Sequence, residues 1–265
     1  MNEQSAVTEQ MLLRRDGDGI AWLTLNRPGA RNALSLGLME SLVAELDAIE
    51  ADPAVKVVVI GGAGPAFCAG HDLKEMRANP ERASHKAVFA QCSRLMQAIV
   101  HLPKPVIARV HGIATAAGCQ LVASCDLAVA ADTARFATPG VNIGLFCSTP
   151  MVALTRAVGR KAAMEMLLTG DMVDAAQARA IGLINRAVPE AELDQAVAAL
   201  AGQIASKSPL TVAIGKEAFH RQAEMHLAEA YDFAAEVMTR NMMARDAAEG
   251  IDAFIGKRAP VWTGS

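Results

Sequence analysis

One stretch of the chain, residues 106–120, constrains the fold more than any other. Val106–Val110 is an uninterrupted run typical of a buried strand, His111-Gly112 predicts a turn, and a helix is expected to open on the small residues Ala116, Ala117 and Gly118. A helix N-terminus presents backbone N–H groups without partners and carries partial positive charge. The segment therefore predicts either a site for a developing oxyanion or close packing of a helix on a sheet.

The segments before this stretch alternate between strand and helix patterns. Ile20–Leu25 predicts a strand, and Ser35 is placed to cap a helix whose apolar residues recur at helical spacing. Val57–Ile60 lacks polar alternation, which is typical of a strand buried on both faces of a largely parallel sheet. Residues 73–85 are polar and are expected to be mobile. Strand, helix, strand, helix predicts an α/β fold.

The last third of the chain is expected to be almost entirely helical. Ile184–Pro189 predicts a short final strand, and Ser208-Pro209 is a helix start with serine as cap and proline in the first turn. The expected helices beyond the strand span residues 190–205, 208–221, 224–245 and 246–256. We therefore divide the chain into an α/β core, residues 11–205, and a helical region, residues 206–265.

The composition excludes several classes of protein. The net charge is −3 over 265 residues, which gives no reason to expect nucleic-acid binding. No run approaches the roughly 20 apolar residues of a membrane span. The five cysteines show no CxxC or Cys/His spacing, so no metal site is expected. We expect these cysteines to be buried, reduced thiols. Met1–Gln10 lacks the pattern of a signal or transit peptide, and we expect a cytoplasmic protein.

Two segments about 40 residues apart carry a family resemblance. Ala66-Phe67-Cys68-Ala69-Gly70-His71-Asp72-Leu73-Lys74-Glu75-Met76, together with His111 to Leu121, resembles the enoyl-CoA hydratase/isomerase (crotonase) superfamily. Further matches in order are Asn26-Arg27-Pro28, Cys125 to Ala128, Phe136 to Gly140, Leu168 to Gly170 and Phe254 to Pro260. The resemblance implies a spiral core of strand–strand–helix turns, as in ClpP-like folds, and C-terminal helices that form a trimer, often paired into a hexamer.

The resemblance also implies an acyl-CoA thioester as substrate, with CoA as part of the substrate and no separate cofactor. The family's oxyanion hole consists of two backbone N–H groups, which fall on His71 and Ala117. A preorganised donor of this kind typically contributes about 3–4 kcal/mol to an enolate-like transition state. Residues that the resemblance places near CoA are Arg31, Asn32, Ala33, Leu34, Ala69, Asp72 and Lys74, with Phe254 and Lys257 reaching over from the C-terminal region of the same or a neighbouring subunit.

Both catalytic glutamates of a family hydratase are absent. Gln120 stands where the first is expected, and Gly140 where the second is expected. This pattern resembles the divergent enoyl-CoA hydratase domain-containing branch. Loss of a general base typically lowers the rate by a factor of about 10² to 10⁴, so efficient hydration is doubtful.

Several side chains could substitute for the glutamates. His71 could act as a base, Gln120 and Asn142 could bind a water or a polar acyl group, and Cys147 and Ser148 lie in the segment that lines the acyl site in the family. Asp72 is expected to cap the helix that follows it. His85, His101, His220 and His226 are expected at the surface, and the remaining cysteines as buried fillers.

Three functions remain open. The first is a hydratase-like lyase or isomerase that acts on acyl-CoA through an oxyanion-stabilised enolate. The second is a catalytically weak trimer that binds acyl-CoA or serves as a scaffold. The third is another crotonase-type reaction, such as decarboxylation or thioester hydrolysis. A ClpP-like peptidase is disfavoured because the sequence shows no serine–histidine–aspartate arrangement.

Overall fold

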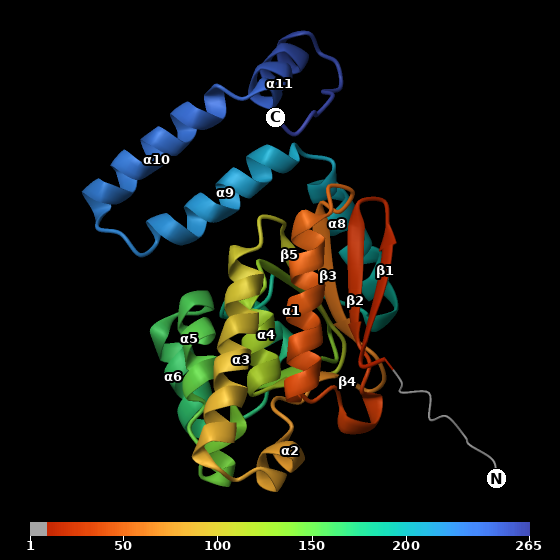
Figure 1. The fold of residues 1–265 in the computed structure, drawn as a ribbon, viewed down its shortest axis with the longest axis vertical. Coiled ribbons are helices and arrows are strands. Elements are labelled where there is room, and N and C mark those ends of the chain that lie inside the picture. Colours follow the sequence, from red (N-terminus) through yellow and green to blue (C-terminus); the bar gives the residue numbers. More distant parts are fainter. Residues whose placement is uncertain (1–9) are drawn as a thin grey trace, which may run out of the picture.

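A six-stranded sheet forms the centre of the molecule, with its strands in the order β1-β2-β3-β5-β7-β10 (Figure 1). The computed structural model describes residues 10–265, so the expectation that Met1–Gln10 carries no targeting signal lies, apart from Gln10, outside the described residues. Its strands are β1 (Leu12–Gly17), β2 (Ile20–Leu25), β3 (Val57–Gly62), β5 (Val106–Val110), β7 (Leu127–Ala131) and β10 (Arg186–Val188). β1 and β2 form an antiparallel hairpin, and all other neighbours are parallel.

A second sheet has four shorter strands in the order β4-β6-β8-β9. These strands are β4 (Ala66–Cys68), β6 (Ile113–Thr115), β8 (Arg135–Ala137) and β9 (Val173–Asp174). β4, β6 and β8 run parallel, and each follows a strand of the larger sheet directly along the chain: β3 precedes β4, β5 precedes β6, and β7 precedes β8. The chain thus repeats a strand–strand–helix turn, which confirms the predicted spiral core.

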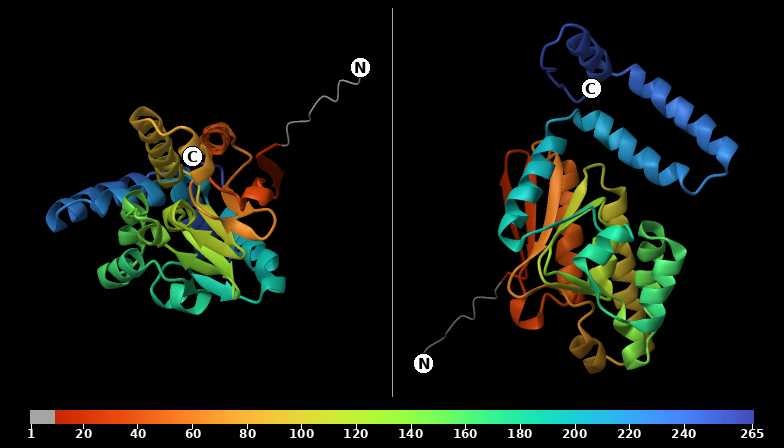
Figure 2. Two further views of the ribbon diagram at one scale, coloured as in Figure 1. Left: turned by 90° about the horizontal axis from the view of Figure 1, so that it is seen from below. Right: turned by 180° about the vertical axis from the view of Figure 1, so that it is seen from behind.

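The chain has eleven α-helices in its described part. They are α1 (Leu36–Ala51), α2 (Leu73–Ala78), α3 (Arg82–His101), α4 (Ala117–Ser124), α5 (Ser148–Ala157), α6 (Arg160–Thr169), α7 (Ala175–Ala180), α8 (Leu193–Ala205), α9 (Pro209–Gln222), α10 (Leu227–Met242) and α11 (Arg245–Ile255). Those before α9 pack around the two sheets. In β3, Val58 and Ile60 join the main core, whereas Val57 and Val59 pack in a second cluster with α8 (Figure 2). β3 is therefore buried on both faces, as predicted.

Two expected helix starts are confirmed. The Ser35 hydroxyl accepts a hydrogen bond from the Leu38 N–H at 3.3 Å, and the Ser208 hydroxyl accepts one from the Thr211 N–H at 3.2 Å. Both hydroxyls satisfy a backbone donor that has no partner inside its own helix. The final strand is also confirmed, as β10 beside β7.

Local sequence patterns did not predict the smaller sheet, and they gave too little helix to residues 73–85. The strands of this sheet have two or three residues each, too few to show a period-2 pattern. Residues 73–85, which were expected to be mobile, form α2 and the first turn of α3 instead. The cause for α2 is Asp72, whose carboxylate accepts hydrogen bonds from Lys74 N–H and Glu75 N–H.

Helices α9–α11 extend away from the core (Figure 1). The buried Lys216 of α9 anchors them: its ammonium donates to Asp126 Oδ2 at 2.7 Å and to the Ile99 carbonyl at 2.9 Å. Within residues 10–265 no single helix has the length and apolar character to cross a membrane, although the bent pair Glu190–Ala205 and Pro209–Gln222 passes that test on length and composition together.

Candidate active site

The site is built where three parallel strands end. The chain leaves β4 towards His71, leaves β6 at the start of α4, and leaves β8 at Thr138. Since β4, β6 and β8 are parallel neighbours, these carboxyl-terminal ends lie at one edge of the smaller sheet. In α/β folds this edge is where ligands bind.

The backbone around His71 turns one N–H towards this edge. Leu34 N–H donates to the Gly70 carbonyl at 2.8 Å, and Asp72 N–H donates to the Leu34 carbonyl at 3.1 Å. These two bonds form a parallel β-bridge between Leu34 and His71. Because N–H groups alternate in direction along an extended chain, the His71 N–H points away from Leu34.

The second backbone donor belongs to Ala117, the first residue of α4. Its N–H cannot be bonded within the helix. The two donor segments are in contact, because a Cβ built on Gly70 would lie 3.4 Å from the Ala117 nitrogen. A Cβ on Gly118 would lie 2.1 Å from the Cys68 carbonyl oxygen, so only glycine lets α4 approach β4 this closely.

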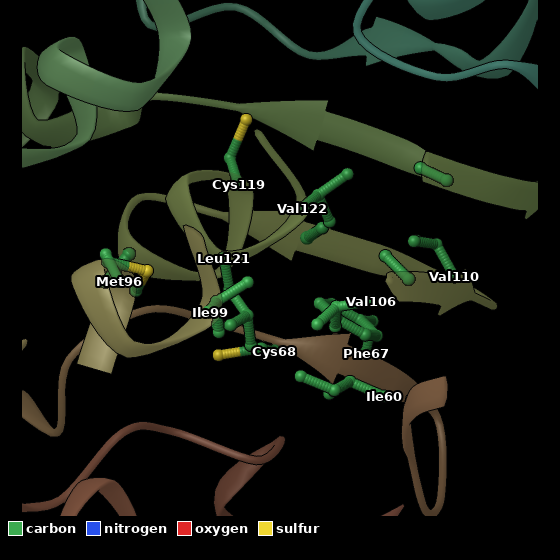
Figure 3. Close-up of a cluster of buried hydrophobic side chains, with 14 of the residues drawn as sticks. Ile60, Phe67, Cys68, Met96, Ile99, Val106, Val110, Cys119, Leu121 and Val122 are labelled. Carbon is green, nitrogen blue, oxygen red and sulfur yellow. The ribbon is translucent and has the colours of Figure 1, made fainter. Parts of the chain in front are cut away.

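The side chains of α4 hold the helix in this position. Leu121 points towards Cys68 and Ile99, whereas Cys119 points to the opposite side of the helix (Figure 3). All four of these residues are almost completely buried. Burial raises the pKa of the Cys68 and Cys119 thiols to about 12, so both act as apolar fillers, as predicted.

The loop of residues 31–34 is held by Asn32, which is fully buried. Its side chain accepts from Arg27 N–H at 2.9 Å and donates to the carbonyls of Ala63 and Ala66 at 2.9 and 2.7 Å. The side-chain oxygen and nitrogen of Asn32 are thus engaged by the protein backbone and are not offered to a ligand. Asn32 therefore shapes the loop that was predicted to flank CoA.

The other residues predicted to flank CoA gather along the same loop pair. Arg31 is exposed, Ala33 is partly buried and Leu34 is buried. Ala69 N–H donates to the Arg31 carbonyl at 3.0 Å, and the Ala69 carbonyl accepts from the Thr115 hydroxyl at 3.1 Å. The structure thus brings residues 31–34 and Ala69 together, while using the Ala69 N–H for an internal bond.

Asp72 caps α2, as expected, and also pairs with Arg27 at 2.9 Å. Burial acts to raise the pKa of this carboxyl, but the Arg27 guanidinium and the two capping N–H groups outweigh burial and hold the pKa below its usual value. Its oxygens are occupied, so Asp72 positions the loop. Lys74, one residue into α2, is exposed and free to reach solvent anions.

Gln120 faces α3. It is 4% exposed, and its Oε1 lies 3.7 Å from Cys92 Sγ on α3. Burial raises the pKa of the Cys92 thiol to about 12, so this thiol keeps its proton and is a weak donor to the amide oxygen. Gln120 thus joins α4 to α3 one turn beyond the Ala117 N–H.

Gly140 lies in a place that leaves no room for a side chain. A Cβ there would stand 2.7 Å from the Leu145 carbonyl oxygen and 2.9 Å from Cys147 Sγ. Residues 144–147 fold back over Gly140, and Leu145 N–H donates to its carbonyl at 2.9 Å. The position of the second family glutamate is therefore closed by the loop itself.

Neither Cys147 nor Ser148 lies in surroundings that would activate it as a nucleophile. Burial raises the pKa of Cys147, and a hydrogen bond from the Gly140 backbone only partly offsets this, so the thiol is not activated. Ser148 is exposed, and its hydroxyl bonds back to the Phe146 carbonyl at 3.3 Å. Asn142 is exposed, with its amide nitrogen beside Gly170.

The His71 side chain is poorly suited to the role of general base suggested by the sequence. Burial lowers its pKa to about 4, so the imidazole is neutral at pH 7 and a weak base. Its ring meets the Phe89 ring edge-on, with centroids 5.5 Å apart. Its Nε2 is buried and has no partner among the described residues.

His85 was expected at the surface, and it is only partly exposed there. The residue is partly buried, and its Nδ1 is also buried without a partner within residues 10–265, as is the hydroxyl of Thr138. The signal was present in the sequence, because His85 precedes the buried Cys92 by two helical turns and shares its face of α3. His101 and His226 are exposed, as expected, and His220 is partly buried.

Phe254 and Lys257 are not brought to this site within one chain. Phe254 is 85% exposed at the end of α11, and α11 lies at the opposite end of the molecule from α2 (Figure 1). The part of the chain that the structure describes holds no cluster of three His, Cys, Asp or Glu that could bind a metal ion.

The fold and this edge are those of the enoyl-CoA hydratase/isomerase family, whose model matches residues 15–265. The chain belongs to this family. It is 50% identical over 251 residues to the mitochondrial enoyl-CoA hydratase domain-containing protein 3 of Homo sapiens, over 94% of this chain and 82% of that protein. The rat protein of the same name is 49% identical over 249 residues, 94% of this chain and 83% of that protein.

Solved structures agree with the fold. The human enoyl-CoA hydratase domain-containing protein 3 superposes with a TM-score of 0.93 at 48% identity, covering 96% of this chain and 100% of that one. An enoyl-CoA hydratase from Mycobacterium smegmatis superposes with a TM-score of 0.94 at 53% identity, covering 96% and 99%. The predicted crotonase fold is confirmed. The cytoplasmic prediction is wrong, because these human and rat relatives are named mitochondrial.

Proposed function

We propose that this chain binds acyl-CoA thioesters and polarises the thioester carbonyl between the backbone N–H groups of His71 and Ala117. The observation that carries the proposal is the pairing of Leu34 with Gly70 and Asp72, which leaves the His71 N–H directed away from Leu34, next to the start of α4. Both donors are fixed before a ligand arrives. Donors that need no reorganisation stabilise a developing enolate oxygen most effectively.

The reaction we favour is hydratase-like or isomerase-like enolate chemistry with atypical acid–base groups. Gln120 is turned towards α3 and its amide cannot take a proton from water, Gly140 offers no side chain, and burial keeps the His71 imidazole neutral. Decarboxylation or thioester hydrolysis would use the same two donors with other proton-transfer groups.

A second candidate is a binding or scaffolding protein with weak turnover. It is favoured by the loop of residues 144–147, which closes the place of one glutamate. The two candidates share the pocket and differ only in rate, so turnover separates them.

The test has a binding part and a turnover part. A conjugated enoyl-CoA bound between two donors should absorb at longer wavelength, because hydrogen bonds to the carbonyl polarise the conjugated system. Butyryl-CoA should bind more tightly than its thioether analogue, S-butyl-CoA, which has no carbonyl. Equal affinity of the two compounds would refute the oxyanion site.

Crotonyl-CoA hydration by the wild type is expected to be slower by about 10² or more than in a hydratase with both glutamates. Gln120→Glu should raise the rate, and Gln97→Glu on the exposed side of α3 serves as the control. A wild-type rate equal to that of an ordinary hydratase would show that the missing carboxylates do not limit this protein.

We further propose a homotrimer, alone or as a dimer of trimers, assembled through α9–α11. The support is the apolar surface of these helices: Tyr231, Met243, Phe254 and Ile255 are 71%, 83%, 85% and 73% exposed in one chain. In such an assembly Phe254 and Lys257 could cover the CoA of a neighbouring subunit. The mass in sedimentation equilibrium tests this, and a monomer would contradict it.

A further inference from the structure

Two histidine nitrogens near the candidate active site are buried and have no hydrogen-bond partner among residues 10–265. They are His71 Nε2, in the loop after β4, and His85 Nδ1, in the first turn of α3. A buried polar atom without a partner typically costs about 1–3 kcal/mol. Such atoms need an explanation, for example a catalytic role or a bound water or ion, and next to a ligand site a polar group of the ligand can fill the same place.

The two histidines belong to one surface of the site. His85, Phe89 and Cys92 follow at intervals of four and three residues and therefore share a face of α3. Phe89 on this face meets the His71 ring edge-on at 5.5 Å and an angle of 81°. The face is thus turned towards the loop that carries the His71 N–H.

The other end of the same face meets α4. Cys92 Sγ lies 3.7 Å from Gln120 Oε1, one helical turn beyond Ala117. In a helix, side chains lean towards the N-terminus, so the Phe89 ring leans over the turn that carries His85. Phe89 therefore neighbours both histidines: its ring contacts the His71 ring, and His85 lies one helical turn before it on α3.

The surface has polar atoms but no buried charge. The His71 imidazole is neutral at pH 7, since burial lowers its pKa to about 4, and Gln120 is neutral. The charged neighbours on α3, Arg82 and Lys86, are exposed. A neutral imidazole offers one N–H donor and one lone pair, which suits a hydroxyl or a keto oxygen better than a carboxylate.

His71 would supply two contacts to a substrate, its backbone N–H to the thioester carbonyl and its side-chain Nε2 to a more distant group. An acyl chain that runs from this carbonyl along the Phe89 face of α3 would meet Nε2 several carbon atoms later.

We propose that the His71–Phe89–His85 surface selects acyl-CoA thioesters whose acyl chain carries an uncharged hydrogen-bonding group, a hydroxyl or keto oxygen, beyond C3. The inference rests on the proposed acyl-CoA function and specifies its substrate class. Phe89 supplies the apolar contact for the chain, and the two imidazoles supply the polar contacts.

Titration calorimetry with three six-carbon thioesters tests the proposal. Hexanoyl-CoA carries no distal polar group, 5-hydroxyhexanoyl-CoA carries an uncharged one, and adipyl-CoA carries a carboxylate. The wild type should bind 5-hydroxyhexanoyl-CoA about five- to tenfold more tightly than hexanoyl-CoA, the effect of one net hydrogen bond.

His85→Leu should abolish this preference, and His101→Leu, on the exposed C-terminal end of the same helix, should keep it. If His85→Leu melts at a much lower temperature than the wild type, His85→Gln is the second variant, and it should keep part of the preference through its amide.

Equal affinity for hexanoyl-CoA and 5-hydroxyhexanoyl-CoA, or a preference that survives His85→Leu, would overturn the inference while leaving the acyl-CoA function intact. Tightest binding of adipyl-CoA would replace it with a carboxylate subsite. Failure of all three thioesters to bind would refute the proposed function itself, and with it this inference.

Discussion

The two sides of the candidate site differ in what they are made of. The oxyanion side consists of Leu34, Ala69–Asp72 and Ala116–Gly118, and it is made of backbone held by backbone. The acid–base side consists of Gln120, Gly140 and residues 142–148. On this side positions 120 and 140, where the resemblance places the glutamates, hold glutamine and glycine, and residues 144–147 fold back over Gly140.

This difference shows which part of a site the fold itself maintains. The two N–H groups are set by the end of β4 and the start of α4, so they persist as long as the spiral core forms. Side-chain acids can be exchanged one at a time without disturbing that core. Substrate activation can thus be retained while proton transfer changes.

The largest effect on stability and acyl-CoA binding should follow from Gly118→Ala, a substitution on the oxyanion side. Its Cβ would lie 2.1 Å from the Cys68 carbonyl oxygen, so α4 must move away from β4. We expect a loss of at least about 3 kcal/mol in the free energy of unfolding, and loss of acyl-CoA binding. Urea unfolding and calorimetry measure both. Gly202→Ala is the control, since a Cβ there meets nothing within 4 Å.

Asn32→Ala should have the next largest effect. The variant loses three hydrogen bonds to backbone groups and places alanine at a φ of 55°. A loss of about 2–3 kcal/mol in the free energy of unfolding is expected, with weaker acyl-CoA binding because the loop of residues 31–34 loosens. The exposed Asn142→Ala should change stability by less than about 0.5 kcal/mol. Equal effects of the two variants would contradict the structural role of Asn32.

The buried His71 imidazole should make stability depend on pH. Its folded pKa, about 4, lies below the unfolded value, so the unfolded chain binds more protons between pH 6.5 and 4. The free energy of unfolding should therefore fall as the pH drops through this range, by on the order of 2 kcal/mol, and His71→Gln should remove that part. An unchanged pH profile in the variant would show that His71 is not buried as described.

The smallest effect is expected on the acid–base side, from Gly140→Ala. Its Cβ would stand 2.7 Å from the Leu145 carbonyl oxygen, so residues 144–147 must move to admit it, whereas α4 and β4 need not. We expect a loss of about 1–2 kcal/mol in the free energy of unfolding and little change in acyl-CoA affinity. If this variant lost binding as completely as Gly118→Ala, the two sides would not be separable.

Much of the fold could be read from local patterns. Ser35 and Ser208 show their capping role in the sequence, and the uninterrupted Val57–Ile60 shows a strand with two buried faces. These features depend on neighbours in the chain. The smaller sheet could not be predicted in this way, because β4, β6 and β8 are short and are stabilised by one another.

The candidate site shows the same division between features set by local sequence and features set by distant segments. The sequence by itself determined the family, the backbone donors at His71 and Ala117 as candidates, and the absence of both glutamates at Gln120 and Gly140. Only the tertiary structure decided which groups are available. It occupies Asn32 and Asp72 with internal bonds, closes the space at Gly140, and buries the nitrogens of His71 and His85. The reason is physical: residue type fixes what an atom can donate or accept, but burial and partners come from segments far apart in the chain.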